Sequence, residues 1–230
     1  MKSRKKLYTL SLLLCFCGTL LSQNTADSLF QLLQNADNDT ARMVLKRQLG
    51  SWYGASDPPK ALVYYKEALA LARKTAKKVS EAKILNALGG LSYYNGNYKA
   101  ALEYAIAGEK LMEELKDKDG LANSYNGISL IYSKNNQYKE ALRYLKKALV
   151  LRVELNDTAS IGQSYNNLGG YFEDTENYDS SLYYYNLSLK YLKLSGDKLG
   201  EGRLLNNIGL INAKRGNYLL AEKHYRLSLA

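Results

Sequence analysis

Cysteine, histidine and proline are nearly absent from this sequence, and each absence narrows what the protein can be. Of 230 residues, two are cysteine, two are proline and one is histidine. Both cysteines, Cys15 and Cys17, lie near the N-terminus, so the chain after residue 22 has no thiol for a disulfide, a catalytic nucleophile or a zinc site. The scarcity of proline favours long helices over a β sandwich rich in turns. We therefore expect a helical protein that is stabilised by packing.

The first 22 residues differ from the rest and have the organisation of a secretory signal peptide. Lys2, Arg4, Lys5 and Lys6 precede an uncharged, largely apolar run over residues 7–21. A membrane anchor is the competing interpretation, but about 15 apolar residues are short for a bilayer that needs roughly 20. We expect cleavage after residue 22, export to the periplasm or cell envelope, and no stable membrane insertion afterwards.

The positive charge that remains is spread over surface-like positions. Removing the four N-terminal cations, and no acid, lowers the formal net charge from +10 to +6. One cluster stands out at the end of a predicted helix: Arg73, Lys74, Lys77 and Lys78. Cations there complement the partial negative charge of a helix C-terminus. This favours a structural role over a nucleic-acid site, and we expect no nucleic-acid partner.

Internal repetition is the strongest signal in the sequence. Four tyrosines recur with a period of about 40 residues, at Tyr98, Tyr138, Tyr178 and Tyr218. The surrounding phrases NGNYKAALEY, NNQYKEALRY, TENYDSSLYY and RGNYLLAEKH are variants of one unit, and a fainter copy comes one period earlier. We expect a short N-terminal helix and linker over residues 23–40. Repeat units then follow at about 41–79, 80–119, 120–159, 160–199 and, incomplete, 200–230.

The first half of each unit is predicted to be an amphipathic helix. In the second unit this helix runs from about Ser80 to Tyr94, because apolar residues such as Leu85 and Leu88 recur at helical spacing. Glycine recurs on this helix, at residues 89, 169 and 209, although it costs about 1 kcal/mol relative to alanine. We therefore expect a neighbouring helix to approach these glycines closely.

A turn and a second helix complete each unit. Asn95 and Gly96 predict the turn, and the second helix is expected to begin at Tyr98. Asparagine precedes the second helix in three units and is predicted to cap it, at Asn97, Asn177 and Asn217. Asp57, followed by Pro58, has the same role in the first unit. Stacked antiparallel pairs of this kind predict an all-α fold, a right-handed α-solenoid.

The pattern resembles the tetratricopeptide repeat (TPR) family. In the third unit its signature positions are Tyr125, Ile128, Ser129, Tyr132, Ala141, Leu145 and Ala148. The usual family repeat is about 34 residues, and the proline that often closes it is absent here. The 40-residue spacing is more similar to the longer-helix subgroup of kinesin light chains. The resemblance covers residues 41–230 and implies binding of a protein or peptide in a concave groove lined by first helices.

Asparagines on the first helices are the candidates for that groove. They recur with the same period, at Asn86, Asn126, Asn166 and Asn206, and similar asparagine ladders occur in the longer-repeat adaptors. The residues three positions earlier are expected to assist: Lys83, Asn123, Gln163 and Arg203. The amides could pair with the backbone of an extended ligand. Alternatively, each amide bonds to the neighbouring repeat and stabilises the array, and the sequence leaves both interpretations open.

No motif for catalysis accompanies the repeats. The sequence has no phosphate-binding loop, no nucleophile elbow and no paired-histidine metal motif. The single histidine, His224, occupies a position that tyrosine fills in the units before it. We expect no enzyme activity, no cofactor and no bound metal. The abundant tyrosines, 21 in all, are expected mainly in the core.

Two classes of function therefore remain. One is an exported scaffold that binds proteins or peptides. The other is a periplasmic sensory or dimerisation module, because the array resembles the sensory regions of bacterial histidine kinases and helix-turn-helix regulators. The second helix of the last unit runs only from Tyr218 to residue 230, which suggests a fragment of a longer protein. Its exposed end predicts self-association through Leu220, Leu227 and Leu229.

Overall fold

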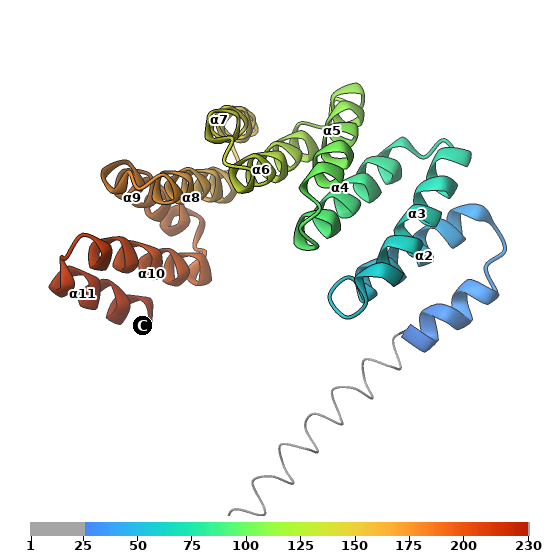
Figure 1. Cartoon of the computed structure of the whole chain (residues 1–230), viewed down its shortest axis with the longest axis horizontal. Helices are drawn as coiled ribbons and strands as arrows, with labels where there is room; N and C mark the ends of the chain where they lie inside the picture. Colours follow the sequence, from blue (N-terminus) through green and yellow to red (C-terminus); the bar gives the residue numbers. More distant parts are fainter. Residues whose placement is uncertain (1–25, 230) are drawn as a thin grey trace, which may run out of the picture. The chain divides into compact units, whose positions relative to one another are not determined.

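The computed structural model describes residues 26–229 (Figure 1). All regular structure within this range is helical, and no strand occurs there. The predicted signal peptide lies outside the described residues. Among the helices of residues 26–229, none combines the length and apolar character that a membrane crossing needs. The described chain forms two compact units, one up to Leu91 and one from Ser92 onward, and each is described by itself.

Helices of nearly equal length follow one another along the chain. In the N-terminal unit, residues 26–34 are helical, and α2 (Asp39–Tyr53), α3 (Pro58–Lys74) and α4 (Lys78–Tyr94) follow, the unit boundary falling inside α4. The C-terminal unit contains α5 (Tyr98–Glu114), α6 (Lys118–Lys134), α7 (Tyr138–Glu154), α8 (Thr158–Asp174), α9 (Tyr178–Ser195), α10 (Lys198–Lys214) and α11 (Tyr218–Ser228). α4 begins two residues before the predicted Ser80, and α5 begins at Tyr98 as predicted.

The turns from α3 onward share one backbone conformation. A residue with positive φ recurs in successive turns, at Ala76, Gly96, Lys116, Asn136, Asn156, Glu176, Gly196 and Gly216. Only three of these eight residues are glycine, the residue that adopts this left-handed region without steric cost. The predicted turn at Gly96 is confirmed, with φ of +73°. Within the C-terminal unit, each of these turns reverses the chain so that consecutive helices lie antiparallel.

The helix caps follow the sequence prediction except at one position. Asn97 and Asn177 each accept a backbone N–H bond of 3.1 Å from the third residue of the following helix. Asp57 does the same for α3, beside Pro58. The predicted cap at Asn217 is wrong, because its side chain forms no such bond. Its backbone ψ is 62°, close to the 59° of the equally uncapped Gln137, whereas Asn97 and Asn177 have 71° and 75°. At both positions the smaller ψ goes together with a side chain that accepts no hydrogen bond from the backbone at the start of the helix.

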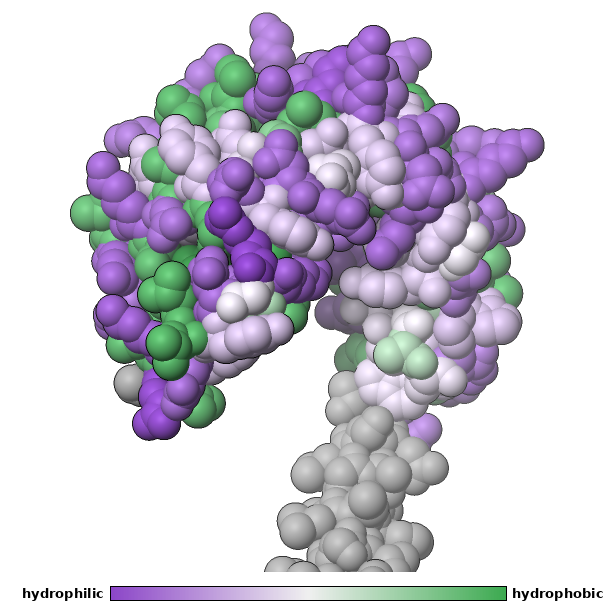
Figure 2. Space-filling model, turned by 60° about the vertical axis from the view of Figure 1, so that its left-hand side comes forward, coloured by the Kyte–Doolittle hydropathy of each residue, from purple (hydrophilic) through white to green (hydrophobic). Residues whose placement is uncertain are grey.

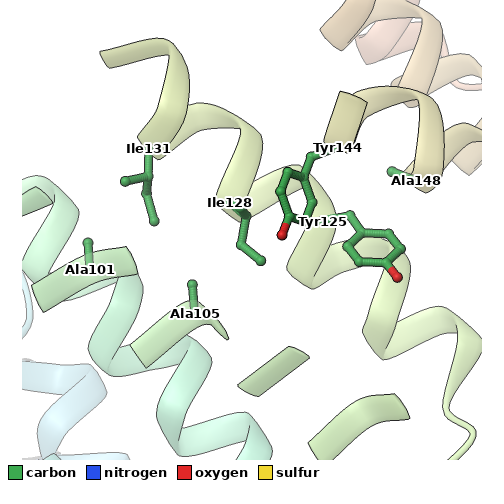
Figure 3. Packing of buried hydrophobic residues seen from close by; sticks show 7 residues of the cluster. All are labelled: Ala101, Ala105, Tyr125, Ile128, Ile131, Tyr144 and Ala148. Atoms are coloured by element: carbon green, nitrogen blue, oxygen red, sulfur yellow. The ribbon is translucent and has the colours of Figure 1, made fainter. Parts of the chain in front are cut away.

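The core of the C-terminal unit lies between successive helices. One cluster joins α5, α6 and α7, and consists of Ala101, Ala105, Tyr125, Ile128, Ile131, Tyr144 and Ala148 (Figure 3). A second cluster joins α9 to α10 through Tyr185, Leu192, Leu204, Ile208 and Ile211. Burial of these apolar side chains stabilises the stack by roughly 25 cal/mol per Å². The predicted all-α solenoid of stacked helix pairs is confirmed.

Candidate functional site

The eight predicted groove residues all lie on first helices, but they are divided between the two units. Lys83 and Asn86 belong to α4 in the N-terminal unit, where Lys83 is exposed and Asn86 is half-buried. Asn86 also has a partner within the described chain. The other six residues belong to α6, α8 and α10 of the C-terminal unit. The site is therefore built from the C-terminal unit alone.

A cavity of about 740 Å³ brings together four of these six residues. Gln163 and Asn166 line it from α8, and Arg203 and Asn206 line it from α10. The spacing explains the arrangement, because residues three apart share one face of a helix. The cavity is also lined by Gly200, Gly202 and Leu204 of α10, Leu192 of α9 and Ser228 of α11. Two consecutive units therefore contribute equivalent residues to one hollow.

A smaller cavity of about 250 Å³ continues along the same first helices. It is lined from α6 by Ser129 and Ser133, and from the C-terminal half of α8 by residues that include Gly170 and Asp174. Asn166 and Asn207 line both cavities. The two cavities therefore adjoin, and together they form a polar groove over α6, α8 and α10, which we call the amide groove.

Several polar side chains of the amide groove have no partner within the described residues. Within residues 26–229, the side chains of Asn166, Asn206 and Asn207 form no hydrogen bond, and Arg203 forms no ion pair. Asn166 and Asn206 therefore form no side-chain bond to the neighbouring repeat within the described residues, whereas Asn86 has a partner. Asn126 differs from them in burial. Its Oδ1 is buried, and it also has no hydrogen-bond partner in the described chain.

Two of the predicted assisting residues form side-chain hydrogen bonds within the described chain. Asn123 accepts a 2.5 Å hydrogen bond from the Arg152 guanidinium of α7 and donates to Asp119 at 3.3 Å. Gln163 donates a 3.2 Å bond to Asn167, one turn along α8. Arg152 is 4% exposed, so Asn123 helps to satisfy a buried charge. Of the assisting residues in the described part of the C-terminal unit, Arg203 is the one whose side chain forms no hydrogen bond or ion pair.

The charged groups around the groove are mostly held in place by one another. The Glu173 carboxylate accepts from the Tyr185 hydroxyl at 2.9 Å and from Lys214 Nζ at 2.7 Å. Burial, followed by the hydrogen bond to Glu173, raises the pKa of Tyr185 far above its usual range. The hydrogen bond to Glu173 likewise raises the pKa of Lys214. At neutral pH Tyr185 is therefore a protonated phenol and Lys214 an ammonium group.

Some groove residues were not singled out from the sequence. Asn207 lines both cavities, and Asn167, at the same position of the preceding unit, lines the smaller one. That spacing is a repeat signal, but it is restricted to two units, because Ala87 and Gly127 occupy the equivalent positions. Glu173 and Asp174 have no acidic counterparts at the equivalent positions of the third unit, Ser133 and Lys134. The repeat spacing could have identified Asn167 and Asn207 from the sequence, but it could not have identified Glu173 and Asp174.

The described residues that line the groove offer hydrogen-bonding groups. Within residues 26–229, no group of three or more His, Cys, Asp or Glu side chains is placed to hold a metal ion. His224 Nδ1 lies 2.7 Å from the backbone oxygen of Leu220 in its own helix. Amides and a guanidinium can recognise the backbone and charged groups of an extended chain.

The basic cluster of the N-terminal unit is partly neutralised. Arg73 pairs with Glu81 at 2.7 Å, and Lys74 pairs with Asp39 at 2.7 Å. Arg73 and Lys74 occupy the last turn of α3, where cations favour the helix dipole. These contacts support the structural interpretation of the cluster.

Comparison with known proteins decides the family. A model of the tetratricopeptide repeat matches residues 80–152 and 160–230, more than half of the chain. The chain belongs to the tetratricopeptide repeat family. None of the curated protein sequences matches it significantly. The TPR match includes α6, α8 and α10, the helices that form the amide groove.

Solved structures share the fold of this TPR chain. BtubC (BKLC) from P. vanneervenii superposes with a TM-score of 0.73 at 20% identity, over 91% of this chain and 87% of that one. A Rap protein complexed with competence and sporulation factor gives a TM-score of 0.75 at 15% identity, over 88% of this chain and 57% of that one. A STAND protein with a tetratricopeptide repeat sensor, from Pyrococcus horikoshii, gives a TM-score of 0.71 at 14% identity, over 90% of this chain and 33% of that one. At these identities the likeness concerns the fold.

Proposed function

We propose that this TPR chain binds an extended segment of another protein, or a free peptide, in the amide groove. The observation that carries the proposal is the set of unpaired side chains in the larger cavity, Asn166, Asn206 and Arg203. Polar groups that are left without partners in a hollow gain from a ligand that supplies those partners. The Rap protein of the same fold was solved with competence and sporulation factor bound, which supports a ligand-binding role.

The energetics set the kind of ligand expected. Each amide contact contributes about 1 kcal/mol net, and a hydrogen bond to the Arg203 guanidinium about 1.5–3 kcal/mol. Micromolar affinity requires about 8 kcal/mol. Apolar contacts must supply part of the difference, and Leu199, which lines the same cavity, is 65% exposed. We expect a ligand of mixed character that presents backbone amides to the asparagines and an apolar side chain to Leu199.

Affinity capture tests the proposal. The chain from residue 23 onward is used as bait on cell-envelope extract, and the captured partner is mapped to a synthetic peptide. The double variant Asn166→Ala, Asn206→Ala should weaken peptide binding about tenfold or more, because two amide contacts are lost. Circular dichroism should show unchanged helix content, because neither side chain forms a hydrogen bond in the described fold.

The matched control is an asparagine outside the groove. Asn186 of α9 is exposed, and its amide donates a 2.8 Å bond to Leu182 in its own helix. Asn186→Ala should bind the peptide as tightly as the parent chain does. Equal binding by the groove variant and this control would place the ligand elsewhere and refute the proposal.

A sensory module is the second candidate function. The solved STAND protein of the same fold is described as having a tetratricopeptide repeat sensor, which favours this alternative. The reading frame downstream of Ala230 distinguishes the two. A membrane helix followed by a kinase or regulator domain would indicate a sensor, whereas a stop codon soon after a capping helix would indicate a scaffold.

Export is part of the same proposal. Its support is the basic and apolar sequence of residues 1–22. Mass spectrometry of the protein from the cell envelope should find an N-terminus at Gln23. A protein that retains Met1 or Lys2 in the cytoplasmic fraction would contradict export.

A further inference from the structure

Gly170 of α8 is a glycine that the described fold does not require. A Cβ at residue 170 would meet its nearest neighbour, the hydroxyl oxygen of Tyr185, at 3.7 Å, which is ordinary van der Waals contact. A Cβ at the preceding Gly169 would instead collide with the Tyr185 ring. Gly170 also lies inside a regular helix and has no positive φ, although glycine is among the poorest helix formers. Gly170 therefore weakens α8 without a packing or backbone reason.

The equivalent position on the neighbouring first helices carries leucine. Leu130 of α6 and Leu210 of α10 stand one repeat before and one repeat after Gly170. Leu130 is 54% exposed and Leu210 is 40% exposed. Helices of the C-terminal unit both precede and follow α6, so the exposure of Leu130 does not come from an end of the unit. The row of Leu130, Gly170 and Leu210 therefore lacks one side chain, at its middle position.

The gap at Gly170 opens into the smaller cavity of the amide groove. Gly170 and Leu130 both line this cavity of about 250 Å³. Leu145 and Tyr171 also line it, beside the groove amides, so part of its wall is apolar. Cavities that hold a whole drug-sized molecule measure about 300–1,000 Å³. The smaller cavity is therefore suited to a single side chain.

An apolar side chain of the bound segment fits this gap. On the face of the protein that Figure 2 shows, hydrophobic side chains are scattered among hydrophilic ones, so apolar recognition is expected at single positions. A side chain that enters the cavity gains free energy by leaving water, and the amides around it can bind the backbone on either side.

We infer that the segment bound in the amide groove places one large apolar side chain, such as leucine, isoleucine or methionine, over Gly170 and against Leu130. This contact is separate from the one expected at Leu199, which lines the larger cavity. The inference rests on the proposed function and makes Gly170 the residue that selects the apolar side chain.

Selection from a random nonapeptide library displayed on phage tests the inference, with the chain from residue 23 onward as bait. The selected peptides should share a large apolar residue, and its replacement by alanine in a synthetic copy should weaken binding to the parent about tenfold or more. Gly170→Leu supplies the missing side chain from the protein itself, so it should bind the synthetic peptide about tenfold more weakly or worse. In this variant the same alanine replacement should change binding by less than about twofold, because the gap no longer accepts the peptide side chain.

Two further variants separate the contact from an effect on folding. Gly170→Ala should raise the melting temperature by about 1–4 °C in circular dichroism, because alanine favours helix and meets no close atom. A lower melting temperature would show that packing requires this glycine and would overturn the inference. Gly127→Leu is the matched control on α6, since a Cβ there meets no described atom within 4 Å and Gly127 lines neither cavity. It should bind the peptide as the parent does, and equal weakening in Gly127→Leu and Gly170→Leu would also overturn the inference.

The outcomes distinguish this inference from the proposed function. Equal binding of the peptide by Gly170→Leu and the parent would overturn the inference, even where the double variant Asn166→Ala, Asn206→Ala loses binding and so supports the amide groove. Equal binding by that double variant and the parent would refute the amide groove as the binding site, and the inference with it. A library that yields no binding peptide would count against both.

Discussion

The ring of Tyr185 lies directly against the backbone of Gly169. A Cβ at residue 169 would fall within 2.9 Å of Tyr185 Cγ and closer still to Cδ1 and Cε1. The same relationship links Gly209 to Tyr225 of α11, with 2.7 Å to Cε1. The close approach predicted from the recurrent glycines is thereby confirmed for Gly169 and Gly209. The approaching group is the tyrosine of the second helix in the same unit.

Alanine at Gly169 should destabilise the C-terminal unit. The added methyl group must displace the Tyr185 ring, which is 2% exposed and hydrogen-bonded to Glu173. We expect a loss of about 1–3 kcal/mol in the free energy of unfolding, measured by urea denaturation. Gly127→Ala is the control, because a Cβ there meets no atom within 4 Å. It should gain about 0.5–1 kcal/mol from helix propensity, and a loss at Gly127 like that at Gly169 would disprove the steric explanation.

Asp119→Asn should cost more stability than the exposure of Asp119 suggests. Its carboxylate is 63% exposed, yet it forms the ion pair of Arg152, whose side chain is 5% exposed. The substitution removes the negative charge beside the buried guanidinium, while Asn123 still accepts its hydrogen bond. We expect a loss of about 1–3 kcal/mol in denaturant unfolding.

The control for this prediction is the exposed ion pair of Asp179 and Arg215, at 2.9 Å. Asp179→Asn should change the free energy of unfolding by at most about 1 kcal/mol. Similar losses in Asp119→Asn and Asp179→Asn would show that burial of Arg152 does not matter.

Stability should fall steeply in alkaline solution, partly because of Tyr125. Burial, aided by the carboxylates of Glu109 and Glu113, raises the pKa of this phenol from 10 to about 12. The unfolded chain therefore loses this proton before the folded chain does. The stabilisation is complete below pH 10, decreases above it, and is lost as the pH rises through about 12.

Tyr125→Phe should weaken this pH dependence. In urea unfolding between pH 9 and 12, the free energy of unfolding of this variant should fall less steeply with pH than that of the parent, by about 1 kcal/mol per pH unit. Tyr94, which is 86% exposed, provides the control Tyr94→Phe, which should keep the parental slope. An unchanged slope in Tyr125→Phe would exclude this phenol as a cause of the alkaline transition.

Glycine at residue 176 should stabilise the chain. Glu176 adopts φ of +58°, a left-handed conformation that costs most side chains about 1–2 kcal/mol. After the greater entropy of glycine in the unfolded chain is deducted, Glu176→Gly should gain about 0.5–1 kcal/mol in thermal or urea unfolding. Asn136 has the same φ, but asparagine tolerates this region better. Asn136→Gly should therefore gain less, and an equal gain would argue against backbone strain at Glu176.

The helices were predictable from the sequence because their signals are local and repeated. The second helix starts at Tyr98 as expected, and α4 starts within two residues of the predicted Ser80. The division between Leu91 and Ser92 could not be predicted. Leu91 occupies the same repeat position as Ile131 and Ile211 of later units and is apolar as they are, so nothing in the spacing marks a boundary there.

The candidate site was only partly predictable for a similar reason. The regular spacing of the repeats located Asn166 and Asn206, but it could not show which polar side chains already have partners. Asn123 is held by Arg152, which lies on the following helix. A hint was present, since Arg152 replaces the apolar residues Met112 and Leu192 of the neighbouring units. Deciding that this arginine binds Asn123 requires the packing of α7 against α6.

The regular turns of the C-terminal unit have a consequence for how such a chain can change in length. Each helix with its turn occupies the same length of chain, and the positive φ falls at the same place in each period. A helix pair that is duplicated or deleted there, together with its two turns, leaves every remaining turn in its original conformation and gives every remaining helix neighbours of the same kind. A single inserted residue, in contrast, rotates the following part of a helix by about 100° and turns its apolar side chains away from the core. Gene variants of this protein should therefore tolerate whole-pair duplications far better than one-residue insertions.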